Sequence, residues 1–432
     1  MLTLIGDVDQ MLYRFNGAKP EILGSEVLSY LPNMLTYKME VNYRSTQRIV
    51  ELQKALIAYN YSDLNGPYEQ GLFKNLVARQ DAPLGEDITF SQYEDAQEES
   101  ESVSTSIETL LNSGYKNGDI FILARTRAQL AFLEGPLTKR KIKFINLTGG
   151  SFWGSKHVQD VVSYLKLATN QDDDKAFQQV FNIASKWFTH PFGKNKGEYC
   201  HHRYLGRAFI DEMKGSFKNT VYAGWRYRAG VDDLTSFLDD LQQALNEGIT
   251  AGIDFVVNNC YKQYLEKDEG LTSQDESENG KLEDFEIIKE IALQFATIEE
   301  FFAYIDEMVK QSEEAKKGNL EDFVVISTVH RVKGQERKVV FGIGISEGYN
   351  VKDETEAGLL PHTYSLVNPP QFGILPTGSK GKVEDERCLM FVMVSRAKEK
   401  VYLSSINTYR KLTLHPSRFV TELGIDYSEF EA

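Results

Sequence analysis

Residues 324–336 read Val-Val-Ile-Ser-Thr-Val-His-Arg-Val-Lys-Gly-Gln-Glu, and this stretch decides the expected fold. It opens with an apolar, β-branched run, which is typical of a strand buried in a parallel sheet. Open α/β sheets place their ligands beyond the carboxyl ends of their strands, so the polar residues that follow are candidates for a ligand site. They are Thr328, His330, Lys333, Gly334 and Glu336. The alternative is an ordinary buried strand followed by a solvated turn.

The side chains of this stretch suit a phosphorylated sugar. Thr328, His330 and Lys333 can donate hydrogen bonds to phosphate, and Glu336 can accept one from a sugar hydroxyl. Gly334 allows the backbone to approach a ligand closely. A second apolar run, 339–345, follows almost at once and predicts a neighbouring strand.

The composition, 41% hydrophobic and 26% charged, is that of a globular chain. Its 432 residues suggest roughly three domains, or two domains with a large insertion. No apolar run approaches the ~18 residues that span a bilayer, and no export signal is evident, so we expect a cytoplasmic protein with no membrane contact. The three cysteines, Cys200, Cys260 and Cys388, are expected to be reduced thiols. Residues 200–202 (Cys-His-His) lack a second ligand pair, so no metal site is expected within the chain.

The net charge is strongly acidic, 48 − 63 = −15. Such a chain does not bind nucleic acid through bulk electrostatic attraction. Any contact with DNA therefore requires a locally basic or aromatic groove.

The expected elements alternate between strands and helices on both sides of a helical block. Residues 2–5 are expected to form a short buried strand, and because a parallel strand needs partners, the chain is expected to begin inside a domain. The expected elements are a helix over 47–58, a helix ending near residue 114, strands over 120–124 and 143–147 around a helix over 129–140, and a helix over 156–168. Residues 170–320 are expected to be helical, with a mobile acidic loop over 266–280. After the strand of residues 339–345 we expect a Gly/Pro-rich loop to residue 383, a helix over 384–397 and a strand over 401–403.

Three further clusters resemble the first in chemistry. Arg396 ends an amphipathic helix, and a planar guanidinium there suits a phosphoryl group, although it can also be a surface arginine in an ion pair. Tyr43 and Arg44 place an aromatic ring beside a second cation. Gln10 follows the expected strand 2–5, where it can orient a water molecule or contact a terminal phosphate.

Together these clusters resemble the UvrD/Rep/PcrA-like DNA helicases of superfamily 1. Gly-Asp-x-Asp-Gln-x-x-Tyr-x-Phe-x-Gly-Ala, at residues 6–18, is similar to motif III of that family. Asn-Tyr-Arg-Ser (42–45) is similar to motif IV, Thr-x-His-x-x-Lys-Gly-x-Glu (328–336) to motif V, and 386–397 to motif VI. Four motifs in the right order make the resemblance specific.

The resemblance implies roles for individual residues. Gln10, Arg44 and Arg396 would contact the γ-phosphate of ATP and act in catalysis, Tyr43 would stack on the base, and Glu336 would meet the ribose beside Gly334. A path for single-stranded DNA would include the remaining candidates, which are Tyr13, Phe15, Thr328, His330 and Lys333. Bases stacked on such aromatic rings contribute roughly 1–3 kcal/mol each, which reduces the need for net positive charge.

The resemblance also implies an α/β fold with a RecA-like parallel-sheet domain. Residues 1–107 would be the end of a first RecA-like domain, 108–170 and 321–432 a second one, and 171–320 its inserted helical subdomain. The implied function is that of the C-terminal portion of an ATP-dependent DNA helicase that moves on single-stranded DNA and unwinds duplex junctions, in the 3′ to 5′ direction.

The chain departs from the family in lacking its phosphate loop. No Gly-x-x-x-x-Gly-Lys-Ser/Thr and no Asp-Glu-x-Gln occurs, and in the family both precede motif III. The Mg²⁺ ligands are therefore expected in a missing upstream part or in a separate chain that carries Walker A and B, and this chain alone is expected to be inactive. A non-catalytic DNA-binding or regulatory subunit and a nuclease-helicase component are the alternatives.

Overall fold

The computed structural model describes most of the chain, and the residue ranges that follow are those it describes. They are 3–12, 20–62, 68–148, 152–173, 175–176, 179–180, 225–262, 276–315, 317–350, 355–366, 383–410 and 412–426. Contacts between Cα atoms divide the chain into two compact units, which are unit 1 (Met1–Gly150 and Ser312–Ala432) and unit 2 (Ser151–Gln311). Each unit is described by itself.

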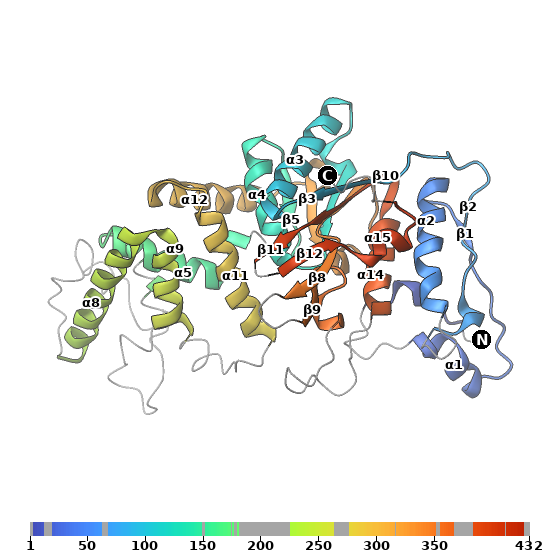
Figure 1. Ribbon diagram of the computed structural model, residues 1–432, viewed down its shortest axis with the longest axis horizontal. Coiled ribbons are helices and arrows are strands. Elements are labelled where there is room, and N and C mark those ends of the chain that lie inside the picture. The colour runs from blue at the N-terminus through green and yellow to red at the C-terminus, as the bar shows by residue number, and fades with distance from the viewer. Residues whose placement is uncertain are drawn as a thin grey trace. The chain divides into compact units, whose positions relative to one another are not determined.

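Unit 1 is built on a six-stranded sheet in which all strands are parallel (Figure 1). In order across the sheet the strands are β3 (Thr89–Tyr93), β10 (Ala397–Ile406), β7 (Arg337–Gly342), β4 (Ile120–Ala124), β6 (Val324–Thr328) and β5 (Phe144–Asn146). The stretch that opens the sequence analysis supplies β6, which lies between β5 and β4, and its neighbour β7 pairs with β4. The predicted α/β fold with a parallel sheet is confirmed.

Both faces of this sheet are covered, because successive residues of a strand point to opposite faces. Phe121 and Leu123 belong to one buried cluster with helix α14, whereas Ile120 and Ile122 belong to a second cluster with helices α3 and α4. The helices of unit 1 are α1 (Ser25–Tyr30), α2 (Gln47–Ala58), α3 (Ala96–Asn112), α4 (Arg127–Lys139), α13 (Thr363–Leu366), α14 (Val383–Ser395) and α15 (Arg418–Glu422). Covered faces explain why β4 and the first three residues of β6 are continuously apolar rather than alternating.

Two smaller sheets complete unit 1. One is antiparallel, in the order β11 (Thr408–Tyr409), β12 (Leu412–Pro416), β8 (Ser346–Asn350) and β9 (Thr355–Gly358). The other consists of two short parallel strands, β1 (Val41–Asn42) and β2 (Val77–Ala78), beside α2 (Figure 1).

Unit 2 is helical, and its described residues contain no strand. Its helices are α5 (Lys156–Thr169), α8 (Trp225–Glu247), α9 (Ile249–Val256), a π-helix (Val257–Tyr261), α11 (Glu276–Ala292) and α12 (Ile298–Ala315), whose last residues belong to unit 1. Trp153 packs edge-on against Phe301 and Tyr304 at its centre. The prediction of helices with aromatic faces is confirmed for these residues, and Glu276 to Gly280 lie in α11 rather than in a loop.

Two expectations from the sequence are wrong. Residues 3–7 form no strand, and the Ile5 side chain is 90% exposed, because no neighbouring strand in the described part of the chain is available to pair with it. The segment after Ile345 is not a continuous loop, since it contains β8 and β9. Gly348 and the charged residues of this segment hide the alternation that would reveal a strand, and β8 gains its order by pairing with β12.

No helix among the described residues is long and apolar enough to cross a membrane.

Candidate functional site

Segments of unit 1 that are far apart in the sequence meet at the amino edge of the sheet, where β7 and β10 begin, rather than at the carboxyl edge expected from the sequence. Arg44, which precedes α2, forms an ion pair with Glu336, which precedes β7. The Nη1 atom of Arg44 also donates to the backbone oxygen of Ser395 at 2.9 Å, at the end of α14. One guanidinium therefore joins three of the four motifs found in the sequence.

Backbone contacts fix the segment that carries Tyr43 and Arg44. The Asn42 side chain accepts from the backbone N–H groups of Arg44 and Ser45 at 2.8 and 3.0 Å. The Ser45 hydroxyl donates to the oxygen of Ala397 at 2.6 Å. Tyr43 itself remains 74% exposed, so its ring is accessible to a planar ligand.

Arg396, the residue after Ser395, is buried, with 1% of it exposed. Its guanidinium donates to the backbone oxygens of Val392 (3.1 Å) and Gln335 (3.2 Å) and to the Ser395 hydroxyl (2.8 Å). Burial and the nearby Arg44 lower the pKa of Arg396 to about 10, so it still carries its charge at neutral pH. Within the described residues no carboxylate forms an ion pair with it, which leaves its charge suited to an anionic ligand.

Glu336 is held by two cations. Lys398 contacts its Oε1 atom at 2.8 Å, while Arg44 contacts Oε2. The hydrogen bond from Lys398, followed by the contacts with Arg44, lowers the pKa of Glu336 below its ordinary value. Lys398 was not among the predicted site residues, although it lies two positions after Arg396, near the start of β10.

Gln10 is held on the other side of the cluster. Its side-chain amide donates to Asp7 at 2.7 Å, and its backbone oxygen accepts from Lys333 at 3.0 Å. Lys74 forms ion pairs with both Asp7 and the buried Asp9. Lys74 was also missed, because nothing in its local sequence distinguishes it from a surface lysine.

Gly334 lies between these groups with φ +88°, a conformation that favours glycine. No atom lies within 4 Å of the position that a Cβ would take, so the backbone has open space in front of it. A side chain would strain the turn and fill that space.

A second polar cluster lies at the opposite, carboxyl edge of the sheet. Arg125, which follows β4, forms a two-pronged ion pair with Glu386 of α14, with contacts of 2.9 to 3.1 Å. Burial raises the pKa of Glu386, but Arg125 more than offsets this and keeps it below the ordinary value. Burial, together with Arg125, lowers the pKa of both His330 and His362 to about 4, so both are neutral at pH 7.

The structure therefore brings most of the predicted site residues together in unit 1. Arg44, Glu336 and Arg396 lie together through the contacts described above, and Gln10 contacts Lys333, three residues before Glu336. Thr328 ends β6, and His330 follows it in a short 3-10 turn (Val329–Val332). Tyr13 and Phe15 lie outside the described residues.

The cluster has no set of side chains for Mg²⁺. Among the described residues no group of three or more histidine, cysteine, aspartate or glutamate side chains is placed to hold a metal ion. The donor set, with two guanidinium groups and a single carboxylate, fits an anion instead.

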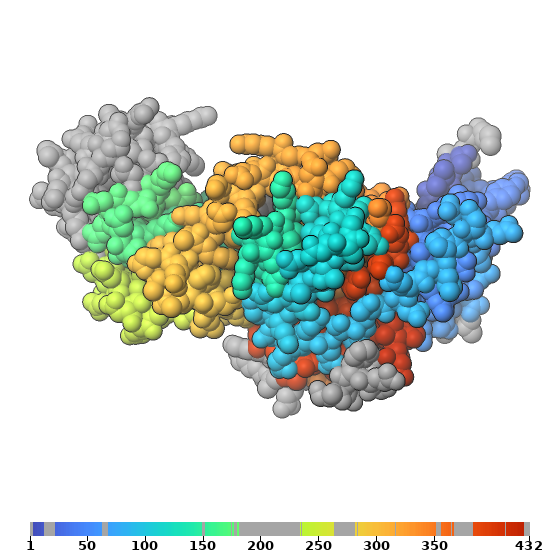
Figure 2. Space-filling view, turned by 90° about the horizontal axis from the view of Figure 1, so that it is seen from above, coloured from blue at the N-terminus to red at the C-terminus, as the bar shows by residue number. Residues whose placement is uncertain are grey.

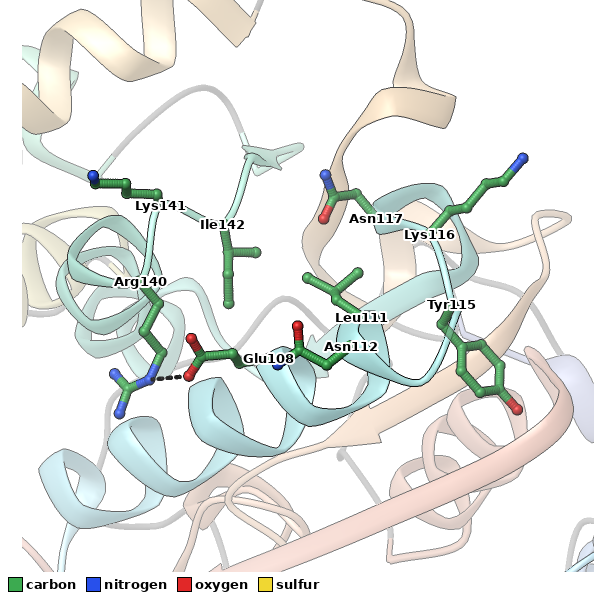
Figure 3. Close-up of a pocket in the computed structure, with 9 residues that line it drawn as sticks. All are labelled: Glu108, Leu111, Asn112, Tyr115, Lys116, Asn117, Arg140, Lys141 and Ile142. Atoms are coloured by element: carbon green, nitrogen blue, oxygen red, sulfur yellow. Dashed lines mark ion pairs between the residues drawn. The ribbon is translucent and has the colours of Figure 1, made fainter.

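A separate hollow lies at the amino ends of β4 and β5, and none of its lining residues belongs to this cluster (Figure 3). Its volume is about 490 Å³, and it is lined by the end of α3, the segment before β4 and the turn after α4. Leu111 and Ile142 form part of its wall, and Arg140 pairs with Glu108 at 3.8 Å beside them.

The chain is similar in sequence to known proteins over most of its length. Residues 37–192 and 233–408 match the family described as the UvrD-like helicase C-terminal domain. The chain is 28% identical to the ATP-dependent DNA helicase PcrA of Bacillus subtilis over 449 aligned positions, which cover 99% of this chain and 54% of the relative. It is 27% identical to DNA helicase II of Escherichia coli, with 97% of this chain and 54% of that relative covered. The chain thus spans about half the length of these relatives.

Proposed function

The chain belongs to the UvrD-like helicase C-terminal domain family, and from this premise we propose that it is the C-terminal portion of an ATP-dependent DNA helicase. The proposal rests on one observation above all, the convergence of Arg44, Glu336 and Arg396 where strands β7 and β10 of the parallel sheet begin. Relatives that match nearly the whole chain are named as ATP-dependent DNA helicases, which supports the same activity.

In this proposal the cluster binds the polyphosphate and sugar of ATP. Arg44 and Arg396 contact the γ-phosphate, Gln10 contacts the same group, and Glu336 accepts from the ribose beside Gly334. The exposed ring of Tyr43 stacks on the base. When ATP is bound, its hydrolysis supplies the free energy for movement along DNA, and guanidinium groups that stabilise the transition state contribute roughly 10³–10⁵ in rate.

Arg396 has to exchange partners to take this role. Its present acceptors are two backbone oxygens and one hydroxyl, all neutral. A phosphate oxygen carries charge and forms a stronger bond with a guanidinium than a neutral oxygen does. The γ-phosphate would therefore replace these weaker partners of Arg396. Arg44 would release Glu336 in part and turn to the phosphate, while Lys398 keeps its ion pair with Glu336.

The proposed DNA path includes His330 of the second cluster and Lys333, which contacts Gln10. Thr328, His330 and Lys333 contact DNA phosphate or connect it to the nucleotide site, and Tyr13 and Phe15 stack on bases. With a pKa of about 4, His330 acts there as a neutral hydrogen-bonding group rather than a cation. Lys333 already contacts the backbone of Gln10 and so lies between the two proposed ligands.

We further propose the domain assignment given by the resemblance. Residues 1–107 end a first RecA-like domain, residues 108–170 and 321–432 form the second, and 171–320 are inserted in it. Mg²⁺ and the phosphate loop are supplied by another segment, in the same polypeptide or in a separate chain. A cytoplasmic location and 3′ to 5′ movement follow from the family alone and stay predictions.

The competing proposal is a non-catalytic DNA-binding or regulatory subunit. The retained pair of arginines speaks against it, because such a subunit makes no use of two cations at a nucleotide site. The test is the rate of ATP hydrolysis by the native protein isolated from its source, with and without single-stranded DNA. We expect hydrolysis that DNA stimulates, whereas DNA binding without hydrolysis would support the regulatory subunit.

A strand-displacement assay then tests direction. Duplexes with a 3′ or a 5′ single-stranded extension are offered to the same preparation, and we expect unwinding of the 3′-extended duplex only. Unwinding of the 5′-extended duplex alone would refute the assigned direction.

A further inference from the structure

The carboxylate of Glu336 is shared by two cations, each of which holds one of its oxygen atoms. Arg44 contacts the Oε2 atom through its Nε atom. Lys398 contacts the Oε1 atom through its Nζ atom at 2.8 Å. An oxygen whose charge is already balanced by a cation is a weaker acceptor for a further hydrogen bond than a free carboxylate oxygen. In this arrangement neither oxygen of Glu336 is therefore free to bind a sugar hydroxyl strongly.

Arg44 is the partner of Glu336 that an anion can draw away. Its Nη1 atom donates to the backbone oxygen of Ser395 at 2.9 Å, whereas no acceptor among the described residues contacts its Nη2 atom. Burial, and after it the charge of Arg44, lowers the pKa of Arg396, so the two guanidinium groups repel each other. An anion bound to both of them relieves this repulsion. Arg44 therefore gains from leaving the carboxylate for a phosphate group.

Lys398 is the partner that stays. Glu336 precedes the first residue of β7, and Lys398 is the second residue of β10, in which Ala397 lies opposite Arg337 of β7. The Glu336–Lys398 pair thus joins two neighbouring strands of one sheet. Arg44 reaches the carboxylate from the segment before α2, outside this sheet. Helix α2 packs against α14 and β10, and Figure 2 shows these blue and red segments in contact.

The group as a whole carries more positive than negative charge. Its cations are Arg44, Arg396 and Lys398, and among the described residues the only carboxylate that pairs with any of them is that of Glu336. The side chains of Arg44, Glu336 and Lys398 are 29%, 38% and 41% exposed, so a ligand from solution can reach them. A polyphosphate balances the surplus charge only if one cation turns from the carboxylate to the phosphate.

We propose that Lys398 is a positioning residue that makes recognition of the nucleotide's sugar depend on the γ-phosphate. The γ-phosphate draws Arg44 away from the Oε2 atom of Glu336, and the released oxygen accepts a hydrogen bond from the ribose hydroxyl. Lys398 meanwhile keeps the Oε1 atom occupied. A nucleoside diphosphate lacks the group that attracts Arg44, so its ribose finds both oxygens bound to cations. The inference rests on the proposed function and adds how the site distinguishes a triphosphate from a diphosphate.

The second cation is what links the two contacts. Without Lys398 the Oε1 atom would accept from the ribose while Arg44 stays on Oε2, and a diphosphate would be held by its sugar as well as a triphosphate is. With Lys398 in place the ribose competes with Arg44 for a single oxygen. Coupling of this kind is reciprocal, so a ribose on Oε2 also favours Arg44 on the phosphate.

Dissociation constants of four nucleotides test the proposal on the native protein. They are β,γ-imido-ATP, which resists hydrolysis, ADP, and the 2′,3′-dideoxy form of each, all measured with Mg²⁺ by isothermal titration calorimetry. The sugar effect is the factor by which loss of the two hydroxyls weakens binding. We expect a sugar effect of about tenfold or more for the triphosphate and of about threefold or less for the diphosphate, because only the released oxygen forms a strong bond.

Three variants test whether Lys398 is responsible. Lys398→Met should make the two sugar effects equal, whereas Lys398→Arg, which keeps a cation on Oε1, should preserve the difference. Lys400→Met removes the ion pair with Glu86 on the same strand and should also preserve it. A merely structural role of Lys398 would weaken all four nucleotides alike and leave the ratio of the two sugar effects unchanged.

The outcomes separate this inference from the proposed function. Equal sugar effects in the original protein would overturn the inference alone, and so would an undiminished difference in Lys398→Met. Failure of all four nucleotides to bind the native protein would refute the proposed nucleotide site itself, and the inference with it.

Discussion

Arg44 and Glu336 form an ion pair across 292 positions of sequence, and Lys398 binds the second oxygen of the same carboxylate. The three side chains come from the segment before α2, the turn before β7 and the start of β10. The parallel pairing of β7 with β10 places the last two next to each other, since Ala397 lies opposite Arg337. The proposed nucleotide site therefore depends on the sheet, and each of its charged groups has a defined partner.

We predict that removal of Lys398 changes the pKa of Glu336, because Lys398 forms a hydrogen bond with this carboxylate. A carboxyl whose pKa is depressed in the folded state contributes stability above its unfolded pKa and loses that contribution as the pH falls. Lys398→Met should therefore raise the pKa of Glu336, measured by carbon NMR titration of the carboxyl group. Lys400→Met, which removes the pair between Lys400 and Glu86 on the same strand, is the control and should leave Glu336 unchanged. An unaltered pKa in Lys398→Met would contradict the contact.

We predict that the stability of the protein depends on pH through the ionisation of Glu99. It is a buried carboxyl that accepts from the Ser404 hydroxyl at 2.6 Å and the Gly344 N–H at 2.9 Å, and burial raises its pKa to about 7. Its stabilising contribution is complete below pH 4.5, the ordinary value, and is lost as the pH rises towards 7. The loss is on the order of 3 kcal/mol at about 1.36 kcal/mol per pKa unit.

Glu99→Gln keeps both hydrogen bonds without a charge. Urea unfolding at pH 5 and pH 8 should show that this variant is more stable than the original protein at pH 8 and little different at pH 5. Equal effects of the substitution at the two pH values would show that the carboxyl does not titrate in this range.

We predict that substitution of Lys74 strongly lowers the free energy of unfolding. It is the cation that faces Asp7 and the buried Asp9, and Asp9 also accepts from Tyr61 at 2.5 Å. Lys74→Met leaves two carboxylates without their counter-ion, which should lower the free energy of unfolding by about 3–5 kcal/mol. Lys338→Met, which removes an exposed pair with Asp119, should cost less than about 1 kcal/mol.

The pH dependence of the Lys74 variant provides a check on the cause. Burial raises the pKa of Asp9 and Lys74 lowers it, so removal of the lysine should let Asp9 protonate more readily. The destabilisation should then be smaller at pH 5 than at pH 8. A loss of stability that is equal at both values would point to altered packing instead.

We predict that substitution of Tyr43 weakens nucleotide binding and leaves the fold intact. Tyr43→Ala in the native protein should weaken ATP binding by about tenfold, in keeping with roughly 1–3 kcal/mol for an aromatic ring stacked on a base. Tyr43→Phe keeps the ring and should bind ATP normally. Because the side chain is exposed, both variants should unfold at the same temperature as the original protein. Normal ATP binding by Tyr43→Ala would remove this residue from the site.

The parallel sheet was predictable because burial dictates its sequence. β4 and the first three residues of β6 are continuously apolar. The bounds of β4, Ile120–Ala124, and of α2, Gln47–Ala58, coincide with the predicted ones. The strand predicted over residues 2–5 failed because an apolar run indicates burial only where a partner exists. β8 was missed for the opposite reason, since its glycine and charged residues look like a loop until β12 pairs with it.

The candidate site was predictable only where its residues lie in motifs. Arg44, Glu336 and Arg396 could be selected from local sequence, but their mutual contacts depend on which strands are neighbours. Lys74 and Lys398 had no local signal, because a lysine becomes a partner of a carboxylate through the tertiary structure alone. The two-pronged contact of Arg125 with Glu386 is of the same kind, as it joins positions 261 residues apart.

The central claim is that Arg396 takes part in ATP hydrolysis, and its most direct test is the DNA-stimulated hydrolysis rate of the Arg396→Ala variant of the native protein. Because the guanidinium is buried and hydrogen-bonded, circular dichroism must first show that the variant is folded, and Arg44→Ala, at a more exposed position, serves as the second variant. The account predicts that folded protein with either substitution loses hydrolysis by about a thousandfold or more. Turnover close to that of the original protein in both variants would contradict it.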